Sequence, residues 1–316
     1  MISGFRLDGG GLTPADGLDD AIWIDLLEPD DAERAQISAL IGAEVPVRAD
    51  QEEIELSSRL YFEQGAAVMT ALLPASTEKA RAEIAPVSFI LTTDRLVTVR
   101  HHRPRPFETF PQRAGKLALP CTSSTTVLIG LLEDIIDRLA DITEVAGRRI
   151  DALSAHTFES EKAADGDFRG ALKEIGRLDG RVAQLRDCLI TTERLLGFLG
   201  TVMDQQKPGR EAKSILKTQV RDVRTISEQT AQLMQKTAFL LDATLGLISV
   251  EQNAIIKIFS VVAVVFLPPT LVASIYGMNF EVMPELSWPL GYPAALFVMF
   301  VSAAAPLLYF RRKGWF

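Results

Sequence analysis

The sequence predicts an α/β domain, then a long helical stalk and two transmembrane helices at the C-terminal end. Three observations support this order. Strand-like apolar segments fall within residues 1–115, proline-free segments with helical periodicity follow, and residues 258–280 and 286–310 carry no charge. We therefore expect a cytosolic α/β domain over 1–115, a cytosolic helical region and stalk over 116–252, and a transmembrane domain over 253–316.

The composition excludes several classes of protein. The chain has 33 Lys and Arg against 41 Asp and Glu, a formal net charge of −8. This balance argues against a nucleic-acid-binding protein, because such a protein needs a basic face. The two cysteines, Cys121 and Cys188, are too few for a disulfide scaffold or a cysteine-rich zinc site, and we interpret both as reduced cytosolic thiols. The first residues contain no basic stretch followed by an apolar one, so no secretory signal is expected.

The first half of the α/β domain contains a strand and a helix in direct succession. Residues 21–27 are a short apolar segment typical of a strand. Residues 28–42 predict a helix with Pro29 in its first turn, acidic residues near its start and Gly42 at its end.

The second half of this domain predicts paired strands. Residues 59–74 are expected to form two strands around Gln64-Gly65, and residues 87–102 a hairpin that turns at Thr93-Asp94. A proline-rich segment follows and predicts a linker. Its prolines are Pro104, Pro106, Pro111 and Pro120.

The middle of the chain predicts long helices. No proline occurs between Pro120 and Pro208, and apolar residues recur there at three- and four-residue spacing, with a break expected around 164–170. A second helical stretch follows Pro208 and meets no breaker before the first uncharged run. We expect one helix from about Glu211 to Leu267, which needs partners from its own chain and from other copies to cover its apolar stripe.

The uncharged runs predict two membrane spans, since a helix needs about 20 apolar residues to cross the hydrocarbon core. The first span is expected at about 257–276, the external loop at 277–288, the second span at about 289–310 and a basic tail at 311–316. The loop contains acidic residues and no Lys or Arg, whereas Lys257 and the tail are basic. The positive-inside rule therefore places both termini in the cytoplasm.

The polar residues of the first span fall on one stripe with a seven-residue repeat. The stripe consists of Asn253, Ile256, Ser260, Ala263, Leu267, Thr270 and Ser274. One interpretation is a seam of small residues that packs against another helix. The other is a water-filled path lined by hydroxyls and gated by Ile256 and Leu267, because polar groups in a membrane are costly unless they face protein or water. Two spans cannot enclose a path, so a pore requires a ring of identical subunits.

The residues after the first span resemble the signature of the CorA family of divalent-cation transporters. Gly277-Met278-Asn279 matches the family's GMN motif, and Met283-Pro284-Glu285-Leu286 follows it. The similarity runs from about Glu251 to the C-terminal RRKGWF and also appears in AIWIDLLEPDDAER (21–34), so it covers most of the chain. This form is typical of the magnesium-transporting branch. The related ZntB zinc-transport branch keeps GMN but usually has different residues after it.

The resemblance implies a funnel-shaped homopentameric channel in the cell inner membrane. It implies passive Mg2+ influx driven by the membrane potential, with Co2+ and Ni2+ as further ions. Gly277, Met278 and Asn279 would form the selectivity filter. The family's pore-lining positions fall on stripe residues, namely Asn253, Ile256, Ser260, Leu267 and Thr270. Mg2+ would be both the transported and the regulatory ion, without an organic cofactor. The partners would be identical subunits, the lipid bilayer and divalent cations.

The side chain of Asn279 suits a filter for hydrated Mg2+. Mg2+ gives up its water reluctantly, and neutral amide oxygens and backbone carbonyls can hydrogen-bond to that water. A ring of carboxylates would hold a dication too tightly, since conduction needs weak sites. Glu281 and Glu285 lie just beyond the filter and are expected either to concentrate cations or to be solvated loop acids.

Charged residues suggest further roles at the cytoplasmic side. A basic collar at the cytoplasmic mouth, or only a topology signal, is expected from Lys257, Arg311, Arg312 and Lys313. Family members close when Mg2+ bridges acidic residues of neighbouring cytosolic domains, and Asp222 is our candidate for such a regulatory ligand. The acids in 28–31 and 49–55 are alternatives, and most are expected to be solvated surface charges. We interpret the three histidines as surface or core residues rather than metal sensors.

Three hypotheses for function remain at this point. The first is a CorA-type Mg2+ channel, the second a zinc or other transition-metal transporter of the ZntB branch, and the third a membrane-anchored sensor or scaffold without transport. An enzyme is not expected, because the sequence offers no nucleophile–base spacing, phosphate-binding glycine loop or metal-ligand cluster.

Overall fold

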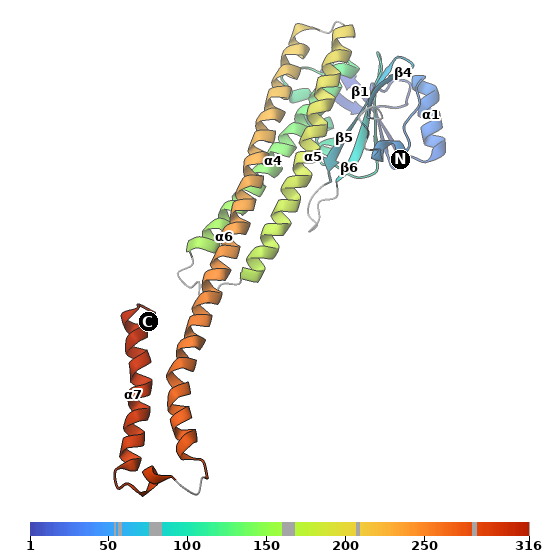
Figure 1. The fold of residues 1–316 in the computed structure, drawn as a ribbon. Helices are drawn as coiled ribbons and strands as arrows, with labels where there is room; N and C mark the ends of the chain where they lie inside the picture. The colour runs from blue at the N-terminus through green and yellow to red at the C-terminus, as the bar shows by residue number, and fades with distance from the viewer. Residues whose placement is uncertain are drawn as a thin grey trace. The chain divides into compact units, whose positions relative to one another are not determined.

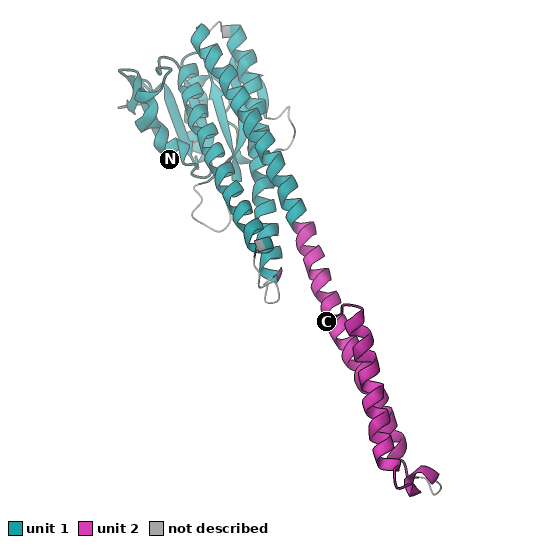
Figure 2. Ribbon diagram, turned by 90° about the vertical axis from the view of Figure 1, so that its left-hand side faces the viewer, with its two compact units in different colours: residues 1–160, 169–240 teal, residues 161–168, 241–316 magenta. Residues whose placement is uncertain are grey.

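The computed structural model describes residues 1–53, 55, 59–75, 84–159, 168–206, 209–279 and 283–315 (Figure 1). The chain divides into two compact units (Figure 2). The N-terminal unit consists of residues 1–160 and 169–240, and the C-terminal unit of residues 161–168 and 241–316. Helix α6 (Arg210–Tyr276) contributes residues to both units.

A seven-stranded sheet organises the N-terminal unit, in the order β2-β1-β3-β7-β6-β5-β4. Strands β3 and β7 pair in parallel, and the other neighbours pair antiparallel. The strands are β1 (Ile2–Asp8), β2 (Gly11–Pro14), β3 (Trp23–Leu27), β4 (Leu60–Glu63), β5 (Ala66–Pro74), β6 (Ile84–Leu91) and β7 (Leu96–Arg100). The central strands β3 and β7 are buried on both faces, so helices must cover both sides of the sheet.

Helices cover the sheet unequally. One face carries the short helices α1 (Asp31–Ile41) and α2 (Arg48–Glu52) over a small apolar core. The other face packs on α3 (Pro106–Arg113), the 3-10 turn η2 (Ala114–Lys116) and the long helices α4 (Ser124–Glu159), α5 (Phe168–Gln206) and α6, which share the large core (Figure 1).

A buried polar network ties the two parallel strands together. Trp23 Nε1 donates to Thr98 Oγ1 at 3.0 Å, and Thr98 Oγ1 donates to Asp25 Oδ1 at 2.8 Å. The Arg100 guanidinium donates to both oxygens of Asp25 and lies 4.9 Å from the ring centroid of Phe107 on α3. Each charge therefore has a close partner, as burial of charge requires.

The predicted helix at 28–42 forms, with one correction at its start. Asp30 is the N-cap residue: its side chain accepts from the Glu33 N–H at 2.8 Å, and the Asp30 N–H donates to the Glu33 carboxylate. Pro29 therefore precedes the helix and does not occupy its first turn. Gly42 ends the helix in the left-handed region with a φ of 67°, as expected.

The linker expected at the four prolines is wrong in part. Residues Pro106 to Arg113 form α3, because Pro106 suits the first helical position and the side chains of Phe107 and Phe110 are buried in the large core.

The two predicted hairpins are confirmed. Their turns lie at Gln64-Gly65, where both φ angles are positive, and between Thr92 and Arg95.

The C-terminal unit contains the end of α6, the 3-10 turn η4 (Pro284–Ser287) and α7 (Gly291–Arg312). Helix α6 continues through Pro268 and Pro269 to Tyr276, beyond the Leu267 expected for its end. Both helices are long and apolar enough to cross a membrane, and only 6% of the most apolar 18-residue window is buried in each. This exposure distinguishes them from core helices of a soluble domain, which are mostly buried.

Candidate functional site

The polar stripe occupies one exposed face of α6. Every member of the stripe from Asn253 to Ser274 is exposed in the chain. The two residues of the expected gate, Ile256 and Leu267, expose 61% and 66% of their surface. A membrane helix that leaves hydroxyls and an amide uncovered needs water or other protein against that face.

The face of α6 that the rest of the chain covers is not the stripe. Val261 is only 4% exposed, and Val265 and Val272 are half-buried. These positions recur at helical spacing and lie on the side of α6 opposite the stripe. Helix α7 runs beside this part of α6 (Figures 1 and 2) and has a half-buried face of its own. That face contains Ala295, Met299, Ser302, Ala303 and Pro306. The stripe is therefore not the seam between the chain's two spans.

Two hydroxyls of the stripe are oriented by their own helix. Ser260 Oγ donates to the Ile256 carbonyl at 2.7 Å, and Thr270 Oγ1 donates to the Phe266 carbonyl at 2.6 Å. The protons of these two hydroxyls are thereby used, which leaves their oxygen lone pairs as acceptors on the exposed face. The water molecules around a cation point their hydrogens outward and act as donors. A face of acceptors therefore suits a hydrated cation better than an anion.

The expected filter begins where α6 ends. The Gly277 N–H donates to the Ala273 carbonyl at 2.9 Å, and the Met278 N–H to the Ile275 carbonyl at 3.3 Å. A Cβ on Gly277 would lie 3.1 Å from the Ala273 oxygen, so crowding rather than a positive φ favours glycine here. Asn279 follows three residues after the helix end and is exposed.

The loop acids are only partly described. Glu285 lies in η4 and its side chain is exposed. Glu281 lies outside the described residues. The carbonyl of Glu285 approaches Gly291 so closely that a Cβ there would lie 2.4 Å away, so glycine is needed at the start of α7.

The basic residues expected at the cytoplasmic mouth gather at the end of α7. Arg311 and Arg312 lie in its last turn, and Lys313 follows with its ammonium 5.3 Å from the Tyr309 ring centroid. The Lys257 ammonium of α6 lies 5.7 Å from the ring centroid of Trp315. The sequence reasoning missed these ring partners, although aromatic residues near span ends were a visible signal.

Asp222, the expected regulatory ligand, is exposed on α6 in the N-terminal unit and lies close enough to Glu133 on α4 for the two charges to interact, a neighbour that sequence reasoning missed. Burial raises the pKa of Glu133 on α4, and the nearby charges of Asp137, Asp134 and Asp222 raise it further. Burial also raises the pKa of Asp134, against the opposing effect of Arg113. Glu133, Asp134 and Asp137 follow a Glu-Asp-x-x-Asp spacing within the predicted helix, and this spacing was the sequence signal for the acidic cluster.

The alternative acids in 28–31 and 49–55 mostly have structural partners. Asp30 caps α1, Asp31 forms an ion pair with Arg34, and Glu52 accepts from Arg48 Nε at 2.8 Å. Within the described part of the chain, no three His, Cys, Asp or Glu side chains are grouped to hold a metal ion.

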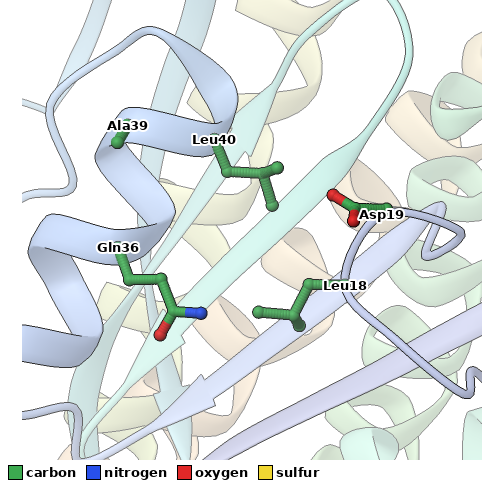
Figure 3. Close-up of a pocket in the computed structure, with 5 residues that line it drawn as sticks. All are labelled: Leu18, Asp19, Gln36, Ala39 and Leu40. Carbon is green, nitrogen blue, oxygen red and sulfur yellow. The ribbon is translucent and has the colours of Figure 1, made fainter.

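An open groove of about 480 Å³ lies beside α1 in the N-terminal unit (Figure 3). Its lining consists of Leu18, Asp19, Gln36, Ala39 and Leu40. None of the expected site residues lines this groove, so it does not contribute to the site on α6.

Comparison with known families adds the decisive observation. A family model described as "CorA-like Mg2+ transporter protein" matches residues 19–312. The chain belongs to this family. Because CorA-like proteins are ion transporters, the chain is not an enzyme, as expected.

Similar proteins agree with this assignment. The chain is 38% identical, over 100% of both sequences, to the magnesium transport protein CorA of Salmonella typhimurium. Its fold resembles the CorA magnesium transporter of Methanocaldococcus jannaschii, with a TM-score of 0.80, 20% identity, and coverage of 100% of this chain and 99% of that one. The ZntB cytoplasmic domain of Vibrio parahaemolyticus gives a TM-score of 0.57 at 10% identity, with coverage of 78% and 97%. The CorA fold expected from the sequence, with its α/β domain, long helix and C-terminal apolar helices, is therefore confirmed.

Proposed function

We propose that this chain is a subunit of a magnesium channel, through which Mg2+ enters passively under the membrane potential. The observation that carries the proposal is the exposed stripe on α6, which turns away from the chain's own second span and offers oxygen acceptors. The full-length similarity to a protein named for magnesium transport supports Mg2+ as the ion.

The stripe requires other copies of the chain. An uncovered polar face is costly in lipid, and the two spans of one chain cannot surround water. A ring of identical subunits, a homopentamer by family resemblance, would bring the stripes together around an aqueous axis. Residues 253–316 would lie in the cell inner membrane, with 1–115 and 116–252 in the cytoplasm together with both termini.

At the outer end of the path, a ring of Asn279 side chains would bind hydrated Mg2+ through its water, with Co2+ and Ni2+ as further ions. Gly277 and Met278 complete this filter, and Glu285 and Glu281 would attract cations toward it. No organic cofactor is part of the proposal. Ile256 and Leu267 would form the hydrophobic constrictions of the gate.

The regulatory part of the proposal places Mg2+ at Asp222. Its support is that the charge of Asp222 acts on Glu133 of α4, whose pKa is raised by burial and, further, by Asp137, Asp134 and Asp222. A dication that binds there would relieve repulsion among acids of neighbouring subunits. Replacing Asp222 with Ala should raise the internal Mg2+ concentration needed for closure, and an unaltered dose–response would remove Asp222 from the regulatory site.

The transport proposal is tested by ion flux into liposomes that contain the purified protein. Mg2+, Co2+ and Zn2+ are compared in the wild type and in Asn279→Ala, with Ser302→Ala on the half-buried face of α7 as the matched control. We expect Mg2+ flux in the wild type and the control and its loss in Asn279→Ala. Zn2+ flux without Mg2+ flux would favour the transition-metal alternative, and absence of all flux would favour the scaffold.

A further inference from the structure

The residues after α7 fold back in a defined helix-ending motif. Gly314 adopts a φ of 70°, its N–H donates to the Arg311 carbonyl at 3.2 Å, and the Trp315 N–H donates to the Phe310 carbonyl at 3.1 Å. This pair of bonds, with glycine in the left-handed region, is the Schellman arrangement. It fixes the direction in which the chain leaves the helix.

The motif places the ring of Trp315 against two partners. The ring stacks on Phe310 with a centroid distance of 4.9 Å and an interplanar angle of 25°. It also lies under the Lys257 ammonium, with 5.7 Å between Nζ and the ring centroid. A cation within about 6 Å of an indole face is attracted by the ring quadrupole, and the attraction grows where water is excluded. The end of one span is thereby joined to the beginning of the other.

Lys257 lies on α6 at the boundary between the exposed stripe and the covered face. Residues three and four positions away are its surface neighbours. On one side these are Asn253 and Ser260 of the exposed stripe, and on the other Val261 of the covered face. A long, flexible lysine side chain can turn toward either side. The Trp315 ring holds it on the α7 side.

We propose that Trp315 is a positioning residue that keeps the Lys257 ammonium away from the inner end of the stripe. The consequence for transport rests on the proposed function. A positive charge beside a path for dications raises the energy of each ion that passes, and the effect is strong where little water screens it. Releasing Lys257 toward Asn253 and Ser260 would therefore obstruct flux without any change in the filter.

The first test is a double-mutant cycle on Mg2+ flux into liposomes. Trp315→Ala should lower the flux by roughly three- to tenfold, a barrier increase of about one RT to a little over two RT. Trp315→Phe keeps a ring for the ammonium and should retain most of the flux. In a Lys257→Met background, Trp315→Ala should cause no further loss. An equal loss in that background would show that Trp315 only stabilises the fold, and would overturn the proposal.

The second test does not depend on transport. The full chain labelled with 5-fluorotryptophan in detergent micelles contains three labels, at Trp23, Trp288 and Trp315. Lys257→Met should shift only the 19F resonance that Trp315→Phe removes, Lys257→Arg should preserve its position, and Lys217→Met at an exposed site of α6 should leave all three unchanged. An unmoved Trp315 resonance in Lys257→Met would overturn the contact whatever the flux. If the wild type carries no flux but Lys257→Met still shifts the Trp315 resonance, the proposed function is overturned and the contact is supported.

Discussion

The two units of the chain use polar residues in opposite ways. In the N-terminal unit, Asp25, Thr98 and Arg100 are buried and bonded to one another inside the sheet. In the C-terminal unit, Ser260 and Thr270 are exposed and bonded only to their own helix. Buried polar networks fix one arrangement of a core, whereas the exposed stripe is suited to bind something outside the chain. The difference separates residues that build the fold from residues that we propose to line the transport path.

Apolar residues show the same contrast. The sheet and its helices bury a large contiguous core, including Trp23 and Phe110. In the C-terminal unit, Phe259 and Phe266 expose 71% and 65% of their surface. So much exposed aromatic surface is incompatible with water around a monomer and is expected in lipid or between subunits. The four predictions below test this contrast, beginning with the largest expected effect.

The largest effect is expected from Asp25→Ala in the sheet. The substitution leaves the Arg100 guanidinium buried without its carboxylate, and breaking a buried pair from one side costs about 3–5 kcal/mol. We expect a loss of that size in the free energy of unfolding of the full chain in detergent, measured by urea titration with circular dichroism. Asp31→Ala, which removes an exposed partner of Arg34, is the control and should cost less than about 1 kcal/mol. Similar costs for the two variants would refute the structural role of the buried network.

The next effect concerns the exposed stripe. Ile256→Ser should increase Mg2+ flux at closing concentrations of internal Mg2+ by about tenfold, because a hydroxyl at a hydrophobic constriction favours its wetting. The matched control is Ile255→Ser, which lies next to it on the flank of α6 and is exposed to 47%. Flux in the control should stay near the wild type. Equal gains in both variants would mean that the stripe does not define the path.

A smaller effect is expected in the labelling of engineered cysteines. Burial raises the pKa of Cys121 to about 11 and, with the charge of Asp187, that of Cys188 to about 12, so both native thiols should react slowly with a charged maleimide. Ser260→Cys should react several times faster than Val262→Cys, which lies on the flank of α6, because only the stripe is expected to face water. Equal slow rates at both positions would favour a dry packing seam over a path.

Periodicity and composition were enough to predict much of this molecule. The two long apolar helices, the helix ending at Gly42 and both hairpins depend on local signals, and all of them form. The stripe on α6 was also predictable, because a helix repeats its faces in a fixed period. Membership of the CorA family followed from Gly277-Met278-Asn279 and its surroundings, and the family match confirms it.

The features that were missed depend on contacts between distant segments. Strand β1 is mixed in polarity and β2 is short, and they form because β1 pairs with both β2 and β3. Helix α3 forms at a proline-rich segment because Phe107 and Phe110 fill the core. The contact of Trp315 with Lys257 joins residues from two helices, so spacing within either segment could not show it.

The smallest effect is expected at the acidic cluster of the N-terminal unit. The folded chain raises the pKa of Glu133, chiefly through burial, so its ionised form is less favourable in the folded than in the unfolded state. That penalty is fully present above the pKa of Glu133 in the folded state, and it disappears as pH falls below the pKa of Glu133 in the unfolded state. Glu133 therefore makes the chain less stable as pH rises from the unfolded to the folded pKa. Glu133→Gln should therefore stabilise the full chain at neutral pH by less than about 1 kcal/mol, since the partly exposed site is screened by solvent.

The pH dependence separates this explanation from a general gain of stability. The advantage of Glu133→Gln should shrink as pH is lowered through the pKa of Glu133, when the wild-type carboxyl becomes neutral as well. Glu144→Gln, an exposed site on the same helix that is paired with Arg148, should give no gain at any pH. Added Mg2+ should reduce the advantage if the cluster around Asp222 binds the ion in the folded chain, because a bound dication offsets the same repulsion. A stability gain of Glu133→Gln that stays constant from acid to neutral pH would contradict the electrostatic origin. It would also remove Glu133 and the neighbouring acids of the N-terminal unit from the regulatory proposal.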